Sequence, residues 1–337
     1  MKKLFIAILA VAGLAACSQD MTLETPKGAA IAFDNAFVNN STRVATDITV
    51  GNLKDFGVYG SVVNNQGQQG LIFKNQEVKK NGNAYSYSPA QYWIADAQYD
   101  FVAIAPYQEN GDGKTPTWTY ATTTEDDAKN GTLTFYNNRA AANQDLLFAY
   151  TKPAKTEATI TTAPAKVGFT FGHLLSKVAF TFKNIFTDGN ISLNVYGVQI
   201  NNAAAEGTLQ VVDGATQSWT GTGDYVRAFG PATADTVAEI ANNGTLTTEH
   251  FYLIPVQREY NVSFKVDIYQ AGVKLDTYTH NITTTINLEK GKSYSLSANL
   301  APNNVNPNSQ LFPIEFQVDA VTGWTQATQD IVSVPNN

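Results

Sequence analysis

The chain has 337 residues, with 22 Lys+Arg against 29 Asp+Glu, a formal net charge of −7, one cysteine and 11% aromatic residues. So much apolar surface excludes a disordered chain, and the acidic balance argues against a nucleic-acid binder, which needs basic groups to neutralise phosphates. A lone cysteine excludes internal disulfides and a thiolate-rich metal site, and a charged fraction of 15% favours strands and polar turns over exposed helices.

The first residues have the pattern of a bacterial export signal. Two lysines precede an apolar run at 4–16, which is shorter than the roughly 20 residues that a membrane-spanning helix needs. The run ends in Leu-Ala-Ala-Cys, which resembles the lipobox of bacterial lipoproteins, where the cysteine thiol carries the lipid. We therefore predict a lipoprotein signal peptide at 1–16, lipidation of Cys17 and a polar tether at 17–27. The membrane would be contacted through this lipid anchor only.

Short alternating runs separated by turn residues dominate the chain from residue 31 onward. The clearest period-2 patterns lie at 260–269 and 314–318, where every second residue is apolar. Such strands place one face on a core and the other in solvent. Because they follow one another at short spacing, they indicate antiparallel β-sandwiches rather than a sheet covered by helices. Helical signals are limited to a short helix or loop at 233–241 and a single turn at 173–177.

The length suggests about two domains. A polar stretch rich in Thr and Pro, 151–165, follows one block of predicted strands and precedes another. We therefore predict an N-terminal β-sandwich at 28–165 and a C-terminal β-sandwich at 166–337.

Residue patterns for catalysis or metal binding are missing from the sequence. The histidines at 173, 250 and 280 lack the spacing of a zinc hydrolase, and there is no Gly-x-Ser-x-Gly elbow. Carboxylates at 109–114 and 125–127 depart from the regular spacing of a calcium loop, so we interpret them as solvated turns and leave calcium binding open. The sequence thus predicts a protein that is not an enzyme and holds neither a metal nor a cofactor.

Four aromatic residues gather at 85–93, namely Tyr85, Tyr87, Tyr92 and Trp93. Exposed rings could stack on sugars, but Tyr-rich strands more often bury the rings and leave the hydroxyls in water. We prefer core packing and keep a surface glycan-binding lipoprotein that does not polymerise as the alternative function. Glycosylation of Thr236, within an Asp-Thr-aliphatic triplet, also stays open.

Several stretches occur in a characteristic order along the chain. They are the lipobox at Cys17, the alternating strand with Ile31 and Phe33, the segment 55–60, Tyr92-Trp93 followed by 99–106, Asp145-Leu146-Leu147, and Phe171-Gly172-His173 leading into Leu175-Ser176-Lys177. Together they resemble the fimbrillin family, the pilus subunits of anaerobic Gram-negative bacteria.

The resemblance implies an all-β fold of two transthyretin-like antiparallel β-sandwich domains in tandem. It also implies a structural and adhesive subunit of a fimbria, exported as a lipoprotein to the outer membrane and cell surface. An arginine-specific protease would cut between Arg43 and Val44, although a solvated arginine in a turn is the alternative for this position. The first strand would then leave and a strand of another subunit would replace it. That displaced strand would be about 29–37, with the apolar residues Ile31, Phe33 and Phe37.

The candidate donor strand is the C-terminal extension 325–337. Family members that act as tips tend to stop soon after the residue equivalent to Trp324, so the extension favours a polymerising subunit. Its β-prone residues are Ile331, Val332 and Val334, and Pro335 limits its length. The expected partners are other fimbrial subunits, the protease and a host or bacterial surface ligand.

Overall fold

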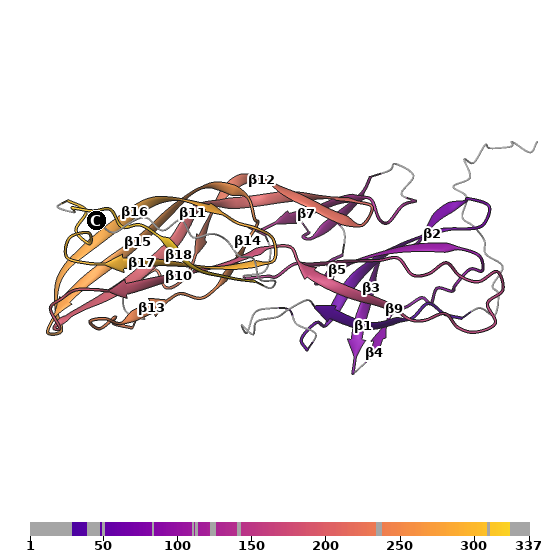
Figure 1. Cartoon of the computed structure of the whole chain (residues 1–337), viewed down its shortest axis with the longest axis horizontal. Coiled ribbons are helices and arrows are strands. Elements are labelled where there is room, and N and C mark those ends of the chain that lie inside the picture. The colour runs from indigo at the N-terminus through magenta and orange to yellow at the C-terminus, as the bar shows by residue number, and fades with distance from the viewer. Residues whose placement is uncertain are drawn as a thin grey trace, which may run out of the picture.

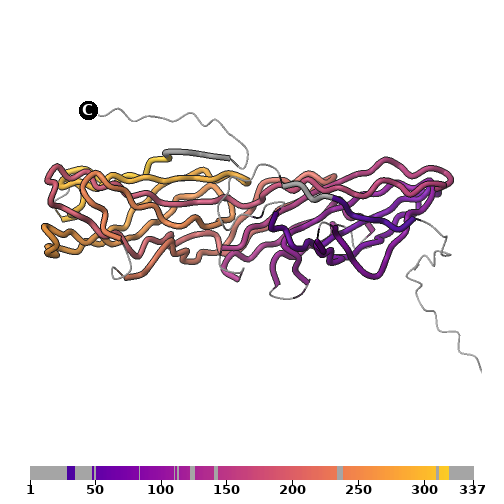
Figure 2. The backbone as a smooth tube through the Cα atoms, turned by 90° about the horizontal axis from the view of Figure 1, so that it is seen from below, coloured from indigo at the N-terminus to yellow at the C-terminus, as the bar shows by residue number. Residues whose placement is uncertain are grey.

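The computed structural model describes residues 29–38, 48, 51–82, 84–109, 111, 114–121, 126–139, 143–233, 238–308 and 311–323. Within these ranges the chain forms 18 strands and no helix, which confirms the all-β class predicted from the alternating pattern. Accordingly, none of the described segments is a helix long and apolar enough to cross a membrane. The molecule is elongated, with an N-terminal and a C-terminal lobe placed end to end (Figures 1 and 2).

The N-terminal lobe is a seven-stranded sheet that curls into a near-barrel. In spatial order its strands are β1 (Phe33–Val38), β9 (Val167–His173), β8 (Leu147–Thr151), β5 (Gln98–Ala105), β2 (Asp55–Val63), β3 (Gln69–Asn81) and β4 (Ala84–Ser86). The curl brings β1 back beside β4, the strand at the opposite end of the sheet (Figure 1).

The C-terminal lobe consists of two facing sheets with a hydrophobic core between them. The five-stranded sheet contains β13 (Thr245–Thr247), β10 (Ser176–Asn184), β17 (Lys292–Leu300) and β18 (Gln317–Gly323), with β14 (Phe251–Leu253) also paired to β10. The six-stranded sheet contains β16 (Val273–Asn287), β15 (Gln257–Gln270), β11 (Ile191–Val212), β7 (Gly131–Tyr136) and β6 (Thr117–Tyr120), with β12 (Ala215–Ala228) also paired to β11.

Two strand pairs are parallel, although the sequence pattern predicted antiparallel sandwiches throughout. Strand β1 runs parallel to β9, and β10 runs parallel to β17, whereas the other described pairings are antiparallel. The prediction is therefore wrong for these two pairs. Alternation reports which face of a strand is buried and carries no information on the direction of its neighbour. The partners of both parallel pairs are far apart in the sequence, as parallel pairing requires.

Strand β5 is buried on both faces because it lies between two hydrophobic cores. Phe101 and Ala103 face the interior of the near-barrel, while Val102 and Ile104 face a second core that includes Trp118 of β6. This second core lies at the junction of the lobes. Burial on both faces explains why β5 reads as a continuous apolar run rather than as an alternating strand.

The lobes share strands across the predicted boundary between residues 165 and 166. Strand β9 follows the boundary yet belongs to the seven-stranded sheet, while β6 and β7 precede it and belong to the six-stranded sheet. Residues 191–200 of β11 pair with β15, and residues 206–211 pair with β7. Pulling β7 away from β11 would break these backbone hydrogen bonds, so the pairing makes the junction resistant to bending. The division into two domains stays a prediction.

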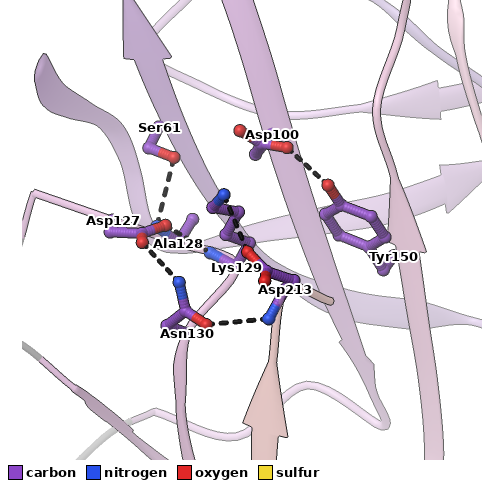
Figure 3. A network of polar contacts seen from close by, with 8 residues as sticks. All are labelled: Ser61, Asp100, Asp127, Ala128, Lys129, Asn130, Tyr150 and Asp213. Atoms are coloured by element: carbon purple, nitrogen blue, oxygen red, sulfur yellow. Dashed lines mark hydrogen bonds and ion pairs between the residues drawn. The ribbon is translucent and has the colours of Figure 1, made fainter. Parts of the chain in front are cut away.

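The tip of the β11–β12 hairpin is fastened to the segment that leads into β7 (Figure 3). Lys129 Nζ lies 2.9 Å from Asp213 Oδ1, and the backbone N–H of Asp213 donates to Asn130 Oδ1 at 2.7 Å. Gly214 N–H donates to the carbonyl of Lys129 at 2.9 Å. The carboxylate of Asp127 accepts hydrogen bonds from Lys129 N–H and from the Asn130 side chain, which holds both residues toward the hairpin.

A buried tyrosine completes this contact between the lobes. The hydroxyl of Tyr150, on β8, donates to Asp100 Oδ1 on β5 at 2.5 Å. Burial, and then the hydrogen bond with Asp100, raises the pKa of Tyr150, so its hydroxyl stays protonated at physiological pH. The Tyr150 ring lies directly against the α-carbon of Gly214, which has a positive φ of 77°.

We predict that Gly214→Ala destabilises the protein more than Gly67→Ala does. Both glycines have a φ of 77°, so both substitutions carry the backbone cost of about 1–2 kcal/mol. Only at Gly214 would the new β-carbon overlap the Tyr150 ring, since nothing lies within 4 Å at Gly67. We expect an additional loss of about 1–3 kcal/mol in the free energy of unfolding, measured by chemical denaturation. Equal losses for the two variants would contradict the packing described here.

Candidate functional site

The N-terminal segment 29–38 bridges the two ends of the seven-stranded sheet. On one side Phe33 pairs with Val167 at the start of β9, in the parallel register. On the other side Ala30 forms an antiparallel bridge with Tyr92, in the loop that follows β4. The segment therefore closes a gap in the near-barrel that no other described strand fills.

Backbone hydrogen bonds hold this segment from both sides of the gap. They are Ile31 N–H to Gln91 O (2.8 Å), Trp93 N–H to Ala29 O (3.1 Å) and Val167 N–H to Ala32 O (2.8 Å). The hydroxyl of Tyr87 donates a further bond to Ile31 O at 2.7 Å. Removing the segment would leave polar backbone groups without partners on both sides, which is costly for groups out of contact with water.

Phe33 is the central side chain of the near-barrel core. It is 3% exposed, and its ring centre lies 5.4–6.4 Å from the centres of five other aromatic rings. Those rings belong to Phe56, Phe73, Tyr87, Phe101 and Phe169. Ile31, which lies two residues earlier, is 1% exposed and joins the same core. Burial of each such side chain contributes about 1.5–3 kcal/mol, so the lobe depends on the segment for much of its stability.

The structure locates only some of the predicted site residues. Ile31 and Phe33 lie in the core, and Phe37 lies on β1 opposite Thr170, with its side chain outside the described residues. The following residues also lie outside them: Cys17, Arg43, Val44, Thr236, Ile331, Val332 and Val334. Lipidation, processing, strand displacement and donation of the C-terminal strand therefore stay predictions.

Most of the aromatic cluster at 85–93 packs inside the near-barrel. Trp93 is 2% exposed and meets Tyr99 edge to face with the ring centres 4.7 Å apart. Tyr85 and Tyr87 are partly buried against the same core. Tyr92 is the exposed member of the four, at 43%. The rings thus follow the core-packing interpretation, and Trp93 offers no accessible face to a sugar.

The tyrosine hydroxyls beside the first segment remain neutral hydrogen-bonding groups. Burial raises the pKa of Tyr99 to about 12, and its hydroxyl accepts a bond from Ile94 N–H at 2.6 Å. Burial likewise raises the pKa of Tyr87, with the backbone hydrogen bond to Gln91 acting in the opposite direction. Both groups therefore serve structure rather than acid–base chemistry near neutral pH.

Two of the family-like segments meet in a buried polar pair that the sequence did not reveal. His173 Nδ1 lies 2.9 Å from Asp145 Oδ2, and both side chains are almost completely inaccessible. The same oxygen of Asp145 accepts a hydrogen bond from Ile48 N–H at 3.2 Å. The two residues lie 28 positions apart, and no local spacing rule links them.

The remaining histidines lie apart from this pair. His280, on β16, is stacked against Phe264, and burial lowers its pKa. His250 precedes β14, where its carbonyl accepts a bond from the Asn143 side chain. Across the described ranges, no three His, Cys, Asp or Glu side chains gather as a metal-ligating group.

Comparison with known families places the chain. The sequence profile of the fimbrillin-like family matches residues 42–311, which is most of the chain, so the protein belongs to this family. It is a structural adhesion family without enzymatic activity, in agreement with the sequence-based expectation that the protein is not an enzyme. No curated protein sequence matches the chain significantly.

Solved structures share the fold at low sequence identity. A fimbrial protein from Bacteroides vulgatus ATCC 8482 is 14% identical with a TM-score of 0.60, over 88% of this chain and 100% of that one. A fimbrial assembly protein from Parabacteroides distasonis ATCC 8503 is 14% identical with a TM-score of 0.44, over 81% of this chain and 91% of that one. The fimbrial anchor protein Mfa2 from Porphyromonas gingivalis is 9% identical with a TM-score of 0.40, over 88% and 97%.

We predict that Phe33→Ala lowers the free energy of unfolding of the N-terminal lobe by about 3–5 kcal/mol, because it leaves a cavity among five aromatic rings. The matched control is Phe312→Ala, whose side chain is 59% exposed and should change stability by less than about 0.5 kcal/mol. Urea denaturation followed by tryptophan fluorescence measures both. A loss for Phe33→Ala as small as that of the control would contradict a central role for this ring.

Proposed function

We propose that this protein is a structural and adhesive subunit of a cell-surface fimbria. In this proposal it is exported as a lipoprotein, anchored in the outer membrane through Cys17, and assembled after its first segment is removed. Membership in the fimbrillin-like family supports the fimbrial role. The observation that carries the assembly step is segment 29–38, which fills the gap in the near-barrel and supplies the central ring of its core.

A cut between Arg43 and Val44 would turn this segment into a separate peptide held by non-covalent contacts alone. Its departure would open an apolar groove bordered by β9 on one side and residues 91–93 on the other. Unpaired backbone groups and apolar pockets of this kind are satisfied by adding a strand from another chain. The protease and the other fimbrial subunits are therefore the partners we propose.

The incoming strand must place two apolar side chains two residues apart, as Ile31 and Phe33 do. In the C-terminal extension 325–337, Val332 and Val334 have this spacing, and residues two apart lie on the same face of a strand. We propose that this extension of one subunit enters the groove of the next. Because it is β-prone and leaves the described fold at the edge strand β18, it is free of any other assigned role.

We further propose that the two lobes are transthyretin-like β-sandwich domains at 28–165 and 166–337, arranged in tandem. Strands β6, β7 and β9 would then cross between them and stiffen each subunit. A stiff subunit suits a fibre that must transmit force along its length.

Arginine-specific proteolysis tests the assembly proposal. Purified, lipidated precursor is treated with an arginine-specific protease, and the products are examined by N-terminal sequencing and electron microscopy. We expect a new N-terminus at Val44, release of the first segment and growth of polymers, because cutting opens the groove. The chain has only three other arginines, of which Arg139 lies exposed in the turn after β7.

Two matched variants make the result specific. Arg43→Lys should stay uncut at this position and monomeric, while Arg139→Lys should polymerise like the original protein. Stable monomers after complete cutting at Arg43 would overturn the proposed assembly.

A further inference from the structure

The chain leaves the near-barrel and returns to it at the same end of β9. Val38, the last residue of β1, pairs with Phe171 of β9. Two residues further along β9, His173 contacts Asp145, and Asp145 accepts the hydrogen bond from Ile48 N–H. The part of the chain that would leave and the part that would stay are thus fastened next to each other, but to different groups.

The contact at Ile48 is made by a buried carboxylate that is itself firmly held. Asp145 Oδ2 receives both His173 Nδ1 at 2.9 Å and Ile48 N–H at 3.2 Å, while Oδ1 receives Leu146 N–H at 2.8 Å. Because an ionised carboxylate only accepts, the imidazole donates from Nδ1. Hydrogen bonds to a charged group are stronger than neutral ones, and a buried carboxylate is costly unless it is paired in this way.

The supports of this pair do not involve the first segment. Leu147 of β8 pairs with His173 of β9, and Leu174 N–H donates to Leu146 O at 2.9 Å. From the C-terminal lobe, Gly291 N–H donates to Leu175 O at 2.9 Å, in the turn that follows β9. Departure of residues 29–43 would therefore leave the Asp145–His173 pair in place.

We infer that Asp145 and His173 are positioning residues for strand exchange, a conclusion that rests on the function proposed above. They hold the chain from Ile48 onward on the lobe after a cut at Arg43, so that the released peptide ends at the cut and the groove stays open. The sequence explains why a holder is needed. Residues 44–50 alternate with Val44, Ile48 and Val50 on one face, and such a β-prone end could enter the vacated groove in place of the donor strand.

Hydrogen exchange in the uncut precursor tests the anchor independently of any cutting. We expect Asp145→Ala to raise the exchange rate of the Ile48 amide by about tenfold or more, because its acceptor is lost. The matched control is Asp267→Ala, which removes another fully buried carboxylate, one that accepts bonds from Tyr196, Lys274 and Thr277 in the C-terminal lobe. The control should leave exchange at Ile48 unchanged.

A second protease reads the consequence after cutting at Arg43. Lys54 is the first lysine after the cut, and its carbonyl accepts a bond from Lys80 N–H at 2.7 Å. We expect a lysine-specific protease to leave Lys54 largely uncut in the original protein and in Asp267→Ala. In Asp145→Ala it should cut there several-fold faster, and polymer yield should fall, because the freed end competes for the groove.

A second pair of variants decides the matter if Asp145→Ala does not fold. Ile48→Pro removes the donated hydrogen, whereas Ile48→Val keeps it. We expect faster cutting at Lys54 in Ile48→Pro alone.

Unchanged exchange at Ile48 in Asp145→Ala, equal effects of Asp145→Ala and Asp267→Ala, or equal cutting of the two Ile48 variants would overturn the inference. Absence of cutting at Arg43 in the original protein would instead overturn the proposed function, and the exchange experiment would still show whether Asp145 holds Ile48.

Discussion

Burial of Phe33 is the interaction on which the N-terminal lobe depends. The ring comes from a segment of ten described residues at the start of the chain, yet it contacts rings on β2, β3, β5 and β9. A core whose centre is supplied by one short segment is complete only while that segment is present. In an ordinary domain this arrangement would be a weakness, whereas in a subunit that exchanges strands it lets one strand substitute for another.

The three cores of the molecule limit the damage that loss of this segment would cause. Phe33 and Ile31 belong to the near-barrel core, whereas the junction core is built from other faces of β2, β5 and β8 together with β6, β7, β11 and β12. The core between the two C-terminal sheets is also separate. Emptying the near-barrel therefore removes contacts from one face of β5 while the opposite face, with Val102 and Ile104, stays packed.

Local signals in the sequence were enough for the strands and for the buried face of the first segment. Alternation predicted the all-β class and placed Ile31 and Phe33 on one face, and the run at 99–105 matched a strand buried on both sides. Relations between distant residues could not be predicted in this way. The parallel register of β1 on β9, the sharing of β7 across the lobes and the contact of Asp145 with His173 depend on how the chain folds back, which no short pattern records.

Strand β9 is where the structural requirements of exchange meet. One of its edges carries β1 from Val167 to Phe171, and its other edge pairs with β8 at Gly172 and His173. The first edge must be able to lose its partner, so the pairing there is made with a segment that ends close to the predicted cut. The second edge must keep its partner, and there the backbone pairing is reinforced by a buried carboxylate and by a turn of the C-terminal lobe. A single strand can thus present a replaceable side and a permanent side, because its two edges form their hydrogen bonds independently.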